Sequence, residues 1–318
     1  MNKVSELLSN EAAQRMLEVA RSIEQSVGSA LLGKGPQVRM ATAAILARQH
    51  ILLTDVPGSG KTTMAMAMAR AVGGTFGRIQ GNPDLLPSDM TGFHLYDQHT
   101  HRWTYRPGPL LHNVVLVDEL NRITPRSQSA LLQAMAEGEI TIDGETIGLP
   151  EPFLVVATMN PFGDIGTFPM GEAQLDRFGL ALSLGIADPA TERQVLKGKG
   201  GAAAVNAIVP AVPIEVLPDI SAVIGEIHVA EPVLDYLLAI AEGLRASMHI
   251  STRALHATLA LARALAALDG RPFVTPDDIR ALAVPCLAHR TNGDLHGCDV
   301  VPTIRSVVEA VPIAPLAA

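Results

Sequence analysis

The sequence predicts an α/β fold in which helices cover a parallel sheet, followed by an all-helical second half. Three observations support this prediction. Short apolar runs alternate with helical patterns, a glycine-bearing turn joins the first such run to a helix, and strand signals fade after Asp188-Pro189. The chain has 318 residues, of which 48% are apolar and 18% charged, which is typical of a globular protein with about two domains.

Composition narrows the classes of protein that need to be considered. The net charge of −8 argues against nucleic acid as the main partner, because binding phosphate requires a basic surface. Two cysteines, Cys286 and Cys298, cannot make a disulfide framework. The first residues lack the apolar stretch of an export signal, and no apolar run reaches the roughly 18 residues of a membrane span. We therefore expect a cytoplasmic protein without membrane insertion.

Helical and strand patterns follow one another in order along the first half. Apolar residues at helical spacing predict a helix over 4–27, and Pro36 suits the first turn of a helix over 37–48. The apolar run 51–53 predicts a buried strand, residues 64–72 a helix, and 76–80 a second strand.

The turn between the first strand and its helix carries a phosphate-binding pattern. It reads Val56-Pro57-Gly58-Ser59-Gly60-Lys61-Thr62-Thr63. Glycines let backbone N–H groups point inward, Lys61 can reach the β- and γ-phosphates, and Thr62 can offer its hydroxyl to Mg²⁺. The strict pattern has glycine where Asp55 stands, so a chance Gly/Ser loop is the alternative. The strand before and the helix after favour a nucleoside triphosphate site.

Two hairpins are predicted outside the main alternation. Residues 81–112 hold four of the eleven aromatic side chains, several histidines and two arginines between turn signals. This insert could contact a client or partner protein, or pack against a neighbouring subunit. Residues 139–149 are centred on Asp143-Gly144, which is a strong hairpin signal.

Two further buried strands end in polar residues. The apolar run 114–117 ends in Asp118 and Glu119, and the run 153–158 is followed by Asn160. Since ligands bind at the carboxyl ends of parallel strands, we expect Asp118 to hold Mg²⁺, Glu119 to take the proton of the attacking water, and Asn160 to orient that water. The plainer alternatives are charges at a helix start and an Asn-Pro turn.

The second half is predicted to be helical. Helical patterns cover 231–248 and 252–269, and a third block begins at Thr275, whereas the Gly-, Ala- and Pro-rich stretch 198–218 is a candidate linker or loop. Four residues in this half have spacings that could suit zinc, although nothing in the pattern requires a metal: Cys286, His289, His296 and Cys298.

Five motifs together resemble the MoxR family of AAA+ ATPases over about residues 28–290. They are Asp55-Val-Pro-Gly-Ser-Gly-Lys-Thr, Asp118-Glu-Leu-Asn-Arg, Thr158-Met-Asn-Pro, Gly166-Thr-Phe-Pro-Met and Glu172-Ala-Gln-Leu-Asp-Arg-Phe178. The resemblance implies an αβα nucleotide-binding core over 1–187, with an inserted hairpin at about 81–112 and another at about 138–149. It also implies a helical lid over 188–318, and it tolerates aspartate at position 55.

The resemblance also suggests roles for single residues. Asn160 would be sensor 1, and Arg177 resembles the arginine finger that reaches the γ-phosphate in a neighbouring subunit. Arg253 resembles sensor 2, although Thr252 stands where the family usually has proline, and Gln80 is a candidate to hold Glu119 away from water. The plainer alternatives are a surface salt bridge for Arg177 and a helix-start arginine without a ligand for Arg253.

The implied activity is ATP hydrolysis with ATP and Mg²⁺ as cofactors, in a homo-oligomer that is most often a hexamer. The family resemblance suggests a chaperone-like factor that remodels or matures a protein complex or metalloenzyme, with a partner that carries a von Willebrand factor A domain. The alternatives are a nucleic-acid motor, as in helicase relatives, and a scaffold that uses ATP only to assemble.

Overall fold

The computed structural model describes residues 11–55, 58–159, 166–290 and 300–313. Five strands form one sheet in the order β2-β5-β8-β1-β9, and each neighbouring pair in it is parallel. The strands are β1 (Ile51–Thr54), β2 (Phe76–Gln80), β5 (Val114–Asp118), β8 (Leu154–Met159) and β9 (Leu180–Leu182). The parallel sheet predicted from the sequence is confirmed.

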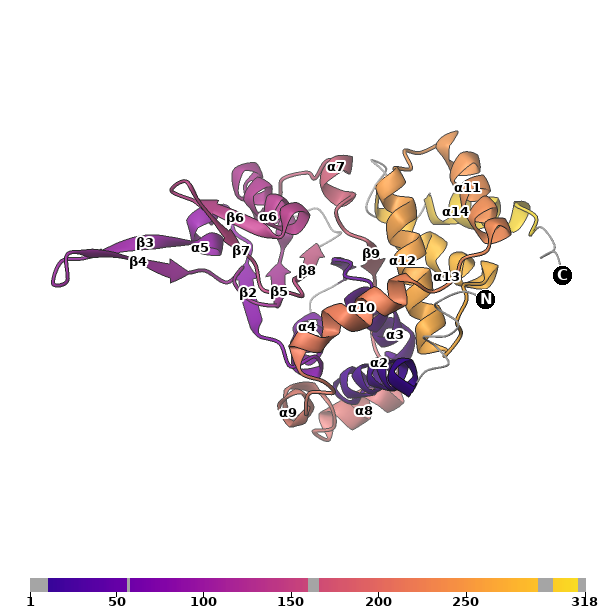
Figure 1. The fold of residues 1–318 in the computed structure, drawn as a ribbon, viewed down its shortest axis with the longest axis horizontal. Coiled ribbons are helices and arrows are strands. Elements are labelled where there is room, and N and C mark those ends of the chain that lie inside the picture. The colour runs from indigo at the N-terminus through magenta and orange to yellow at the C-terminus, as the bar shows by residue number, and fades with distance from the viewer. Residues whose placement is uncertain (1–10, 56–57, 160–165, 291–299, 314–318) are drawn as a thin grey trace.

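Both faces of this sheet are covered, so its central strands β5 and β8 are buried along their whole length (Figure 1). Side chains such as Leu116 and Val156 belong to one apolar cluster with helices α2 (Glu11–Ala30), α3 (Gly35–Leu46) and α4 (Lys61–Ala71). Their neighbours Val115 and Val155 belong to a second cluster with α6 (Pro125–Glu137). The alternation follows the two-residue period of a strand.

Both predicted hairpins are present. The first consists of β3 (Gly92–Asp97) and β4 (Arg102–Pro107), which follow the short helix α5 (Pro87–Thr91) and extend as an arm away from the sheet (Figure 1). The second consists of β6 (Glu139–Ile142) and β7 (Glu145–Gly148). The arm holds exposed aromatic side chains, with Trp103 68% exposed.

Among the described residues after β8, β9 is the one strand and the other regular elements are helices. These helices are α7 (Glu172–Leu175), α8 (Pro189–Leu196), α9 (Gly201–Ala207), α10 (Leu217–Gly225), α11 (Glu231–Arg245), α12 (Thr252–Leu268), α13 (Pro276–Leu287) and α14 (Val300–Ala310). Short 3₁₀ turns lie at η2 (Ile214–Val216) and η3 (Ala288–Arg290), and another, η1 (Leu120–Arg122), lies before β8. None of the helices among the described residues combines the length and hydropathy that crossing a bilayer requires.

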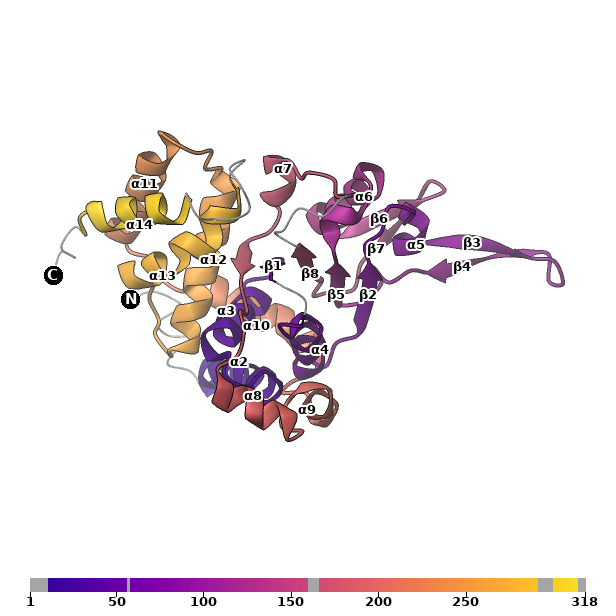
Figure 2. The ribbon, with the colours of Figure 1, turned by 180° about the vertical axis from the view of Figure 1, so that it is seen from behind.

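The interpretation of 198–218 as a linker or loop is wrong in part. Helix α9 lies in this stretch and packs beside α2 and α4 (Figure 2). Val205 is buried there, and the N–H of Ala211 donates to the carbonyl of Ala71. The alanines that made the stretch look featureless are good helix formers, and burial of Val205 orders them.

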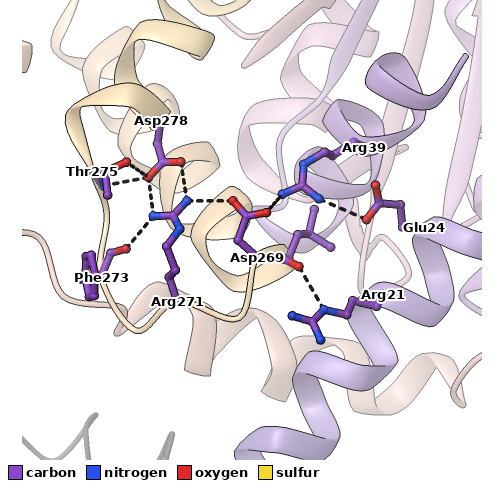
Figure 3. A network of polar contacts seen from close by, with 9 residues as sticks. Arg21, Glu24, Arg39, Asp269, Arg271, Phe273, Thr275 and Asp278 are labelled. Carbon is purple, nitrogen blue, oxygen red and sulfur yellow. Dashed lines mark hydrogen bonds and ion pairs between the residues drawn. The ribbon is translucent and has the colours of Figure 1, made fainter.

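A polar network ties the N-terminal helices to the last helices (Figure 3). Arg39 on α3 pairs with Glu24 on α2 and with Asp269, which follows α12. Arg271 in turn pairs with Asp269 at 2.9 Å and with Asp278 on α13 at 2.7 Å. This network therefore ties α12 and α13 to α2 and α3, and side chains of all four helices belong to the same apolar cluster.

Candidate nucleotide site

The turn after β1 has the backbone that phosphate binding requires. Gly58 and Gly60 have φ angles of 86° and 99°, which are strained for residues with a side chain. Gly60 is the N-cap of α4, and glycine has no side chain that could cap the helix. The first N–H groups of α4 can therefore donate hydrogen bonds to a ligand. The hydroxyl of Ser59 is buried and has no hydrogen-bond partner among the residues that the structure describes. Val56 and Pro57 lie outside the described residues.

Asp55 replaces the first glycine of the strict pattern and has a structural role. Its buried carboxylate accepts hydrogen bonds from the Ser183 hydroxyl at 2.8 Å and from the N–H groups of Leu184 at 2.6 Å and Gly185 at 3.1 Å. These residues follow β9 directly. Asp55 therefore fastens the start of the phosphate loop to the neighbouring strand.

Lys61, Thr62 and Thr63 form the first turn of α4. The Lys61 ammonium group donates to the main-chain oxygen of Asp55 at 2.9 Å, so its side chain folds back over the turn. Any phosphate held by the N–H groups of this turn would lie beside the lysine charge.

A cavity of about 610 Å³ opens beside the turn. Gly58, Ser59, Gly60 and Thr63 form one wall, residues 30–32 with Lys34 a second, and residues of the 185–201 stretch a third. Lys34 joins the last two walls through a hydrogen bond of 3.0 Å from its ammonium group to the carbonyl of Gly185. The volume is that of a small-molecule site, and its position suits the nucleoside part of a triphosphate.

The acidic pair lies at the same edge of the sheet as this turn. Asp118 ends β5, and Glu119 follows it in a left-handed conformation with φ of 54°. One strand, β8, separates β5 from β1, which puts the acids about 10 Å from the strand that leads to Lys61. This spacing leaves room for a phosphate group and a metal ion between them.

Three residues that the sequence analysis did not single out hold the acidic pair. The Thr158 hydroxyl accepts from the N–H of Glu119 at 2.9 Å and lies 3.4 Å from Asp118 Oδ1. Arg78 on β2 pairs with Asp118 Oδ2 at 2.8 Å, and Arg122 pairs with Glu119 Oε2 at 2.9 Å. Arg78 occupies an edge strand, and only the strand order reveals that it faces Asp118.

The predicted contact between Gln80 and Glu119 is wrong for this structure. The Gln80 side-chain oxygen accepts from Arg78 Nη2 at 3.4 Å, and the Glu119 carboxylate pairs with Arg122 instead. The 3₁₀ turn after Glu119 brings position 122 back toward position 119. Asn160 comes after β8 in the sequence and lies outside the described residues.

The two predicted arginines are found at the opposite edge of the sheet. Arg177 precedes β9, and the N–H of Gly179 donates to the carbonyl of His50, the residue before β1. Arg253, on the first turn of α12, lies 3.7 Å from the carboxylate of Asp176. The chain thus places Arg177 and Arg253 together, but not with its own Lys61, because the length of β1 separates the two edges.

Two of the four residues considered for zinc, Cys286 and His289, are buried. Cys286 is buried, which raises the pKa of its thiol to about 12, and His289 hydrogen-bonds the carbonyl of Phe178 at 2.8 Å. His296 and Cys298 lie outside the described residues. Within the described ranges, no group of three or more His, Cys, Asp or Glu side chains could hold a metal ion.

Comparison with known proteins places this geometry in a family. Residues 50–180 match the ATPase family associated with various cellular activities (AAA), and residues 238–302 match the AAA lid domain. The chain is 37% identical to the uncharacterized protein YeaC of Bacillus subtilis, over 91% of this chain and 93% of that protein.

Two further relatives agree. The chaperone MoxR1 of Mycobacterium tuberculosis is 33% identical over 82% of this chain and 72% of its own length. A crystal structure from Cytophaga hutchinsonii, described provisionally as an ATPase, superposes with a TM-score of 0.84 at 30% identity, covering 97% of this chain and 99% of that one. With the phosphate-binding turn, the acidic pair and the sheet order described above, these matches show that the chain belongs to the MoxR family of AAA+ ATPases.

Proposed function

We propose that the protein works as a homo-oligomeric ring, most simply a hexamer, in which two neighbouring subunits form each ATP site. One observation carries this proposal: Lys61 and Glu119 lie at the carboxyl edge of the sheet, whereas Arg177 and Arg253 lie near its amino edge. Arginines that serve phosphate must then serve the phosphate of another copy.

Within the site, each residue type suits one task. The N–H groups of 58–63 and the Lys61 ammonium group would hold the phosphates, and Thr62 and Asp118 would hold Mg²⁺, the latter through water. When bound, Mg²⁺ would neutralise charge on the phosphates. Glu119 would accept the proton of the attacking water, Asn160 would orient it, and Arg177 and Arg253 of the neighbouring copy would stabilise charge at the γ-phosphate.

The left-handed backbone of Glu119 supports its assignment as the base. A glutamate with φ of 54° is strained, and such strain persists where the surroundings impose it, often at functional positions. Here the bond from its N–H to the Thr158 hydroxyl and the turn that follows impose it. The Glu119 carboxylate pairs with Arg122 at 2.9 Å, so it must leave Arg122 to accept a proton from water.

For the biological role, we propose a chaperone-like factor that remodels or matures a protein complex or a metalloenzyme, with a partner carrying a von Willebrand factor A domain. The support is the chaperone MoxR1 among the relatives. The nucleotide-binding core would comprise residues 1–187 and the lid residues 188–318. The arm formed by β3 and β4 would contact the client, since Trp103 is 68% exposed and Tyr96 42% exposed near its tip.

Substitution Glu119→Gln tests the catalytic part of this proposal. The variant should bind ATP with unchanged affinity and hydrolyse it at least about a hundredfold more slowly, because the amide cannot accept a proton. Glu145→Gln, on the exposed strand β7, is the matched control and should hydrolyse ATP normally. Normal turnover by the Glu119 variant would refute the assignment of the base.

A further inference from the structure

The short segment that carries Arg177 is held on both sides by groups from the C-terminal helices. On one side, the Asp176 carboxylate accepts a hydrogen bond of 2.6 Å from the hydroxyl of Ser251, the N-cap of α12. The same carboxylate pairs with the guanidinium of Arg290 and lies 3.7 Å from that of Arg253.

On the other side, the carbonyl of Phe178 accepts two hydrogen bonds from the 3₁₀ turn η3. One comes from Arg290 Nη2 at 2.8 Å and the other from His289 Nε2 at 2.8 Å. Within the C-terminal helices, Arg290 Nε also donates to the carbonyl of Cys286 at 2.8 Å. The planar guanidinium of Arg290 therefore spans the residues before and after Arg177.

Arg290 is unusual in its burial. It is 2% exposed, and a buried arginine costs stability unless its charge is paired and its donors are satisfied. An apolar side chain would fill the same space at lower cost. What an apolar side chain cannot do is join the carboxylate of Asp176 to the carbonyl of Phe178 in a fixed geometry.

Arg177 itself is held more loosely than the residues beside it. Its Nη1 donates to the carbonyl of Ala173 at 2.7 Å, and its Nε is buried without a partner among the described residues. The backbone at position 177 is thus fixed, while the guanidinium keeps donors free for another acceptor.

We propose that Arg290, acting through Asp176 and Phe178, is a positioning residue that sets the direction of the Arg177 side chain toward the ATP site of a neighbouring subunit. This inference rests on the proposed function. It links the C-terminal helices to catalysis: a movement of η3 or of the start of α12 would move the finger and change turnover in the adjacent subunit. The binding of ATP in the subunit that carries Arg290 would be unaffected.

Mixed oligomers separate this role from a general structural one. A Glu119→Gln subunit lacks the base but donates an intact finger, and an Arg177→Ala subunit lacks the finger but retains the base. Each alone should be inactive. An equal mixture should recover about a quarter of the normal activity, because one of four equally frequent neighbour pairings combines both intact parts.

The substitution Arg290→Met is then added to one of the two subunit types in the mixture at a time. In the finger donor, combined with Glu119→Gln, it should reduce the recovered activity at least about tenfold, with an unchanged KM for ATP. In the acceptor, combined with Arg177→Ala, it should leave the recovered activity unchanged. Arg290→Lys in the donor should restore part of the activity, because it keeps a charge beside Asp176. Arg271→Met in the donor is the matched control, since Arg271 pairs with Asp278 and does not touch the segment at 176–178.

The outcomes are distinguishable. Loss of recovered activity only when Arg290→Met is in the finger donor supports the inference. Equal loss of activity with Arg290→Met in the donor or in the acceptor, or no loss with either, would overturn it and leave Arg290 with a role in stability only. If the parent mixture of Glu119→Gln and Arg177→Ala recovers no activity, Arg177 does not complete the ATP site of a neighbouring subunit. The proposed function then fails together with this inference.

Discussion

Restoring the strict phosphate-loop glycine by Asp55→Gly should destabilise the protein. Asp55 is buried, and its carboxylate receives three hydrogen bonds from residues 183–185. Hydrogen bonds to a charged group contribute about 1.5–3 kcal/mol each, but bonds to one carboxylate are not additive, so we expect a loss of about 3–5 kcal/mol. Glycine adds up to about 1 kcal/mol through the entropy of the unfolded chain.

Urea denaturation followed by circular dichroism measures this loss. Asp55→Asn keeps one side-chain oxygen as acceptor and should lose less than half as much free energy of unfolding. Asp84→Gly is the control for glycine itself, because Asp84 is exposed, and should lose about 1 kcal/mol. If the free energy of unfolding of Asp55→Gly is within about 1 kcal/mol of that of the unmodified protein, the hydrogen bonds between Asp55 and residues 183–185 do not stabilise the fold.

Three further predictions follow from buried positions. A Cβ at Gly81 would lie 2.2 Å from the main-chain oxygen of Glu119, so Gly81→Ala should slow ATP turnover at least about tenfold while Gly148→Ala, in open space, should not. Burial lowers the pKa of His50 to about 4 from 6.5. The unfolded chain therefore binds more protons between these values, and the free energy of unfolding measured by urea titration should fall as the pH is lowered through this window, with a shallower slope for His50→Gln. Burial raises the pKa of Cys286 to about 12, so in a Cys298→Ser background the folded protein should not react with a thiol reagent at pH 8, and the urea-unfolded protein should react fully.

Local signals predicted most of the fold and the carboxyl-edge part of the site. Continuous apolar runs identified β5 and β8 because strands buried on both faces need no polar positions. The sequence Asp143-Gly144 identified the turn between β6 and β7, since both residues take positive φ there. These features depend on neighbours in sequence, so the sequence carries them directly.

Contacts between distant residues could not be predicted in the same way. Asp55 meets Ser183 across 128 positions, and Arg290 meets Asp176 across 114. Arg78 faces Asp118 because β2 is the neighbour of β5, which only the strand order reveals. The sequence does not predict helix α9, because Gly, Ala and Pro around it favour a loop locally, whereas packing against α2 and α4 favours the helix.

Completion of each ATP site by a neighbouring subunit is tested most directly by dilution. ATP turnover per subunit is measured over a range of protein concentrations at saturating ATP, with mass photometry at the same concentrations. We predict that turnover per subunit falls in parallel with dissociation and that Arg177→Ala is inactive at every concentration. Full turnover by dissociated subunits, unchanged by Arg177→Ala, would contradict the account.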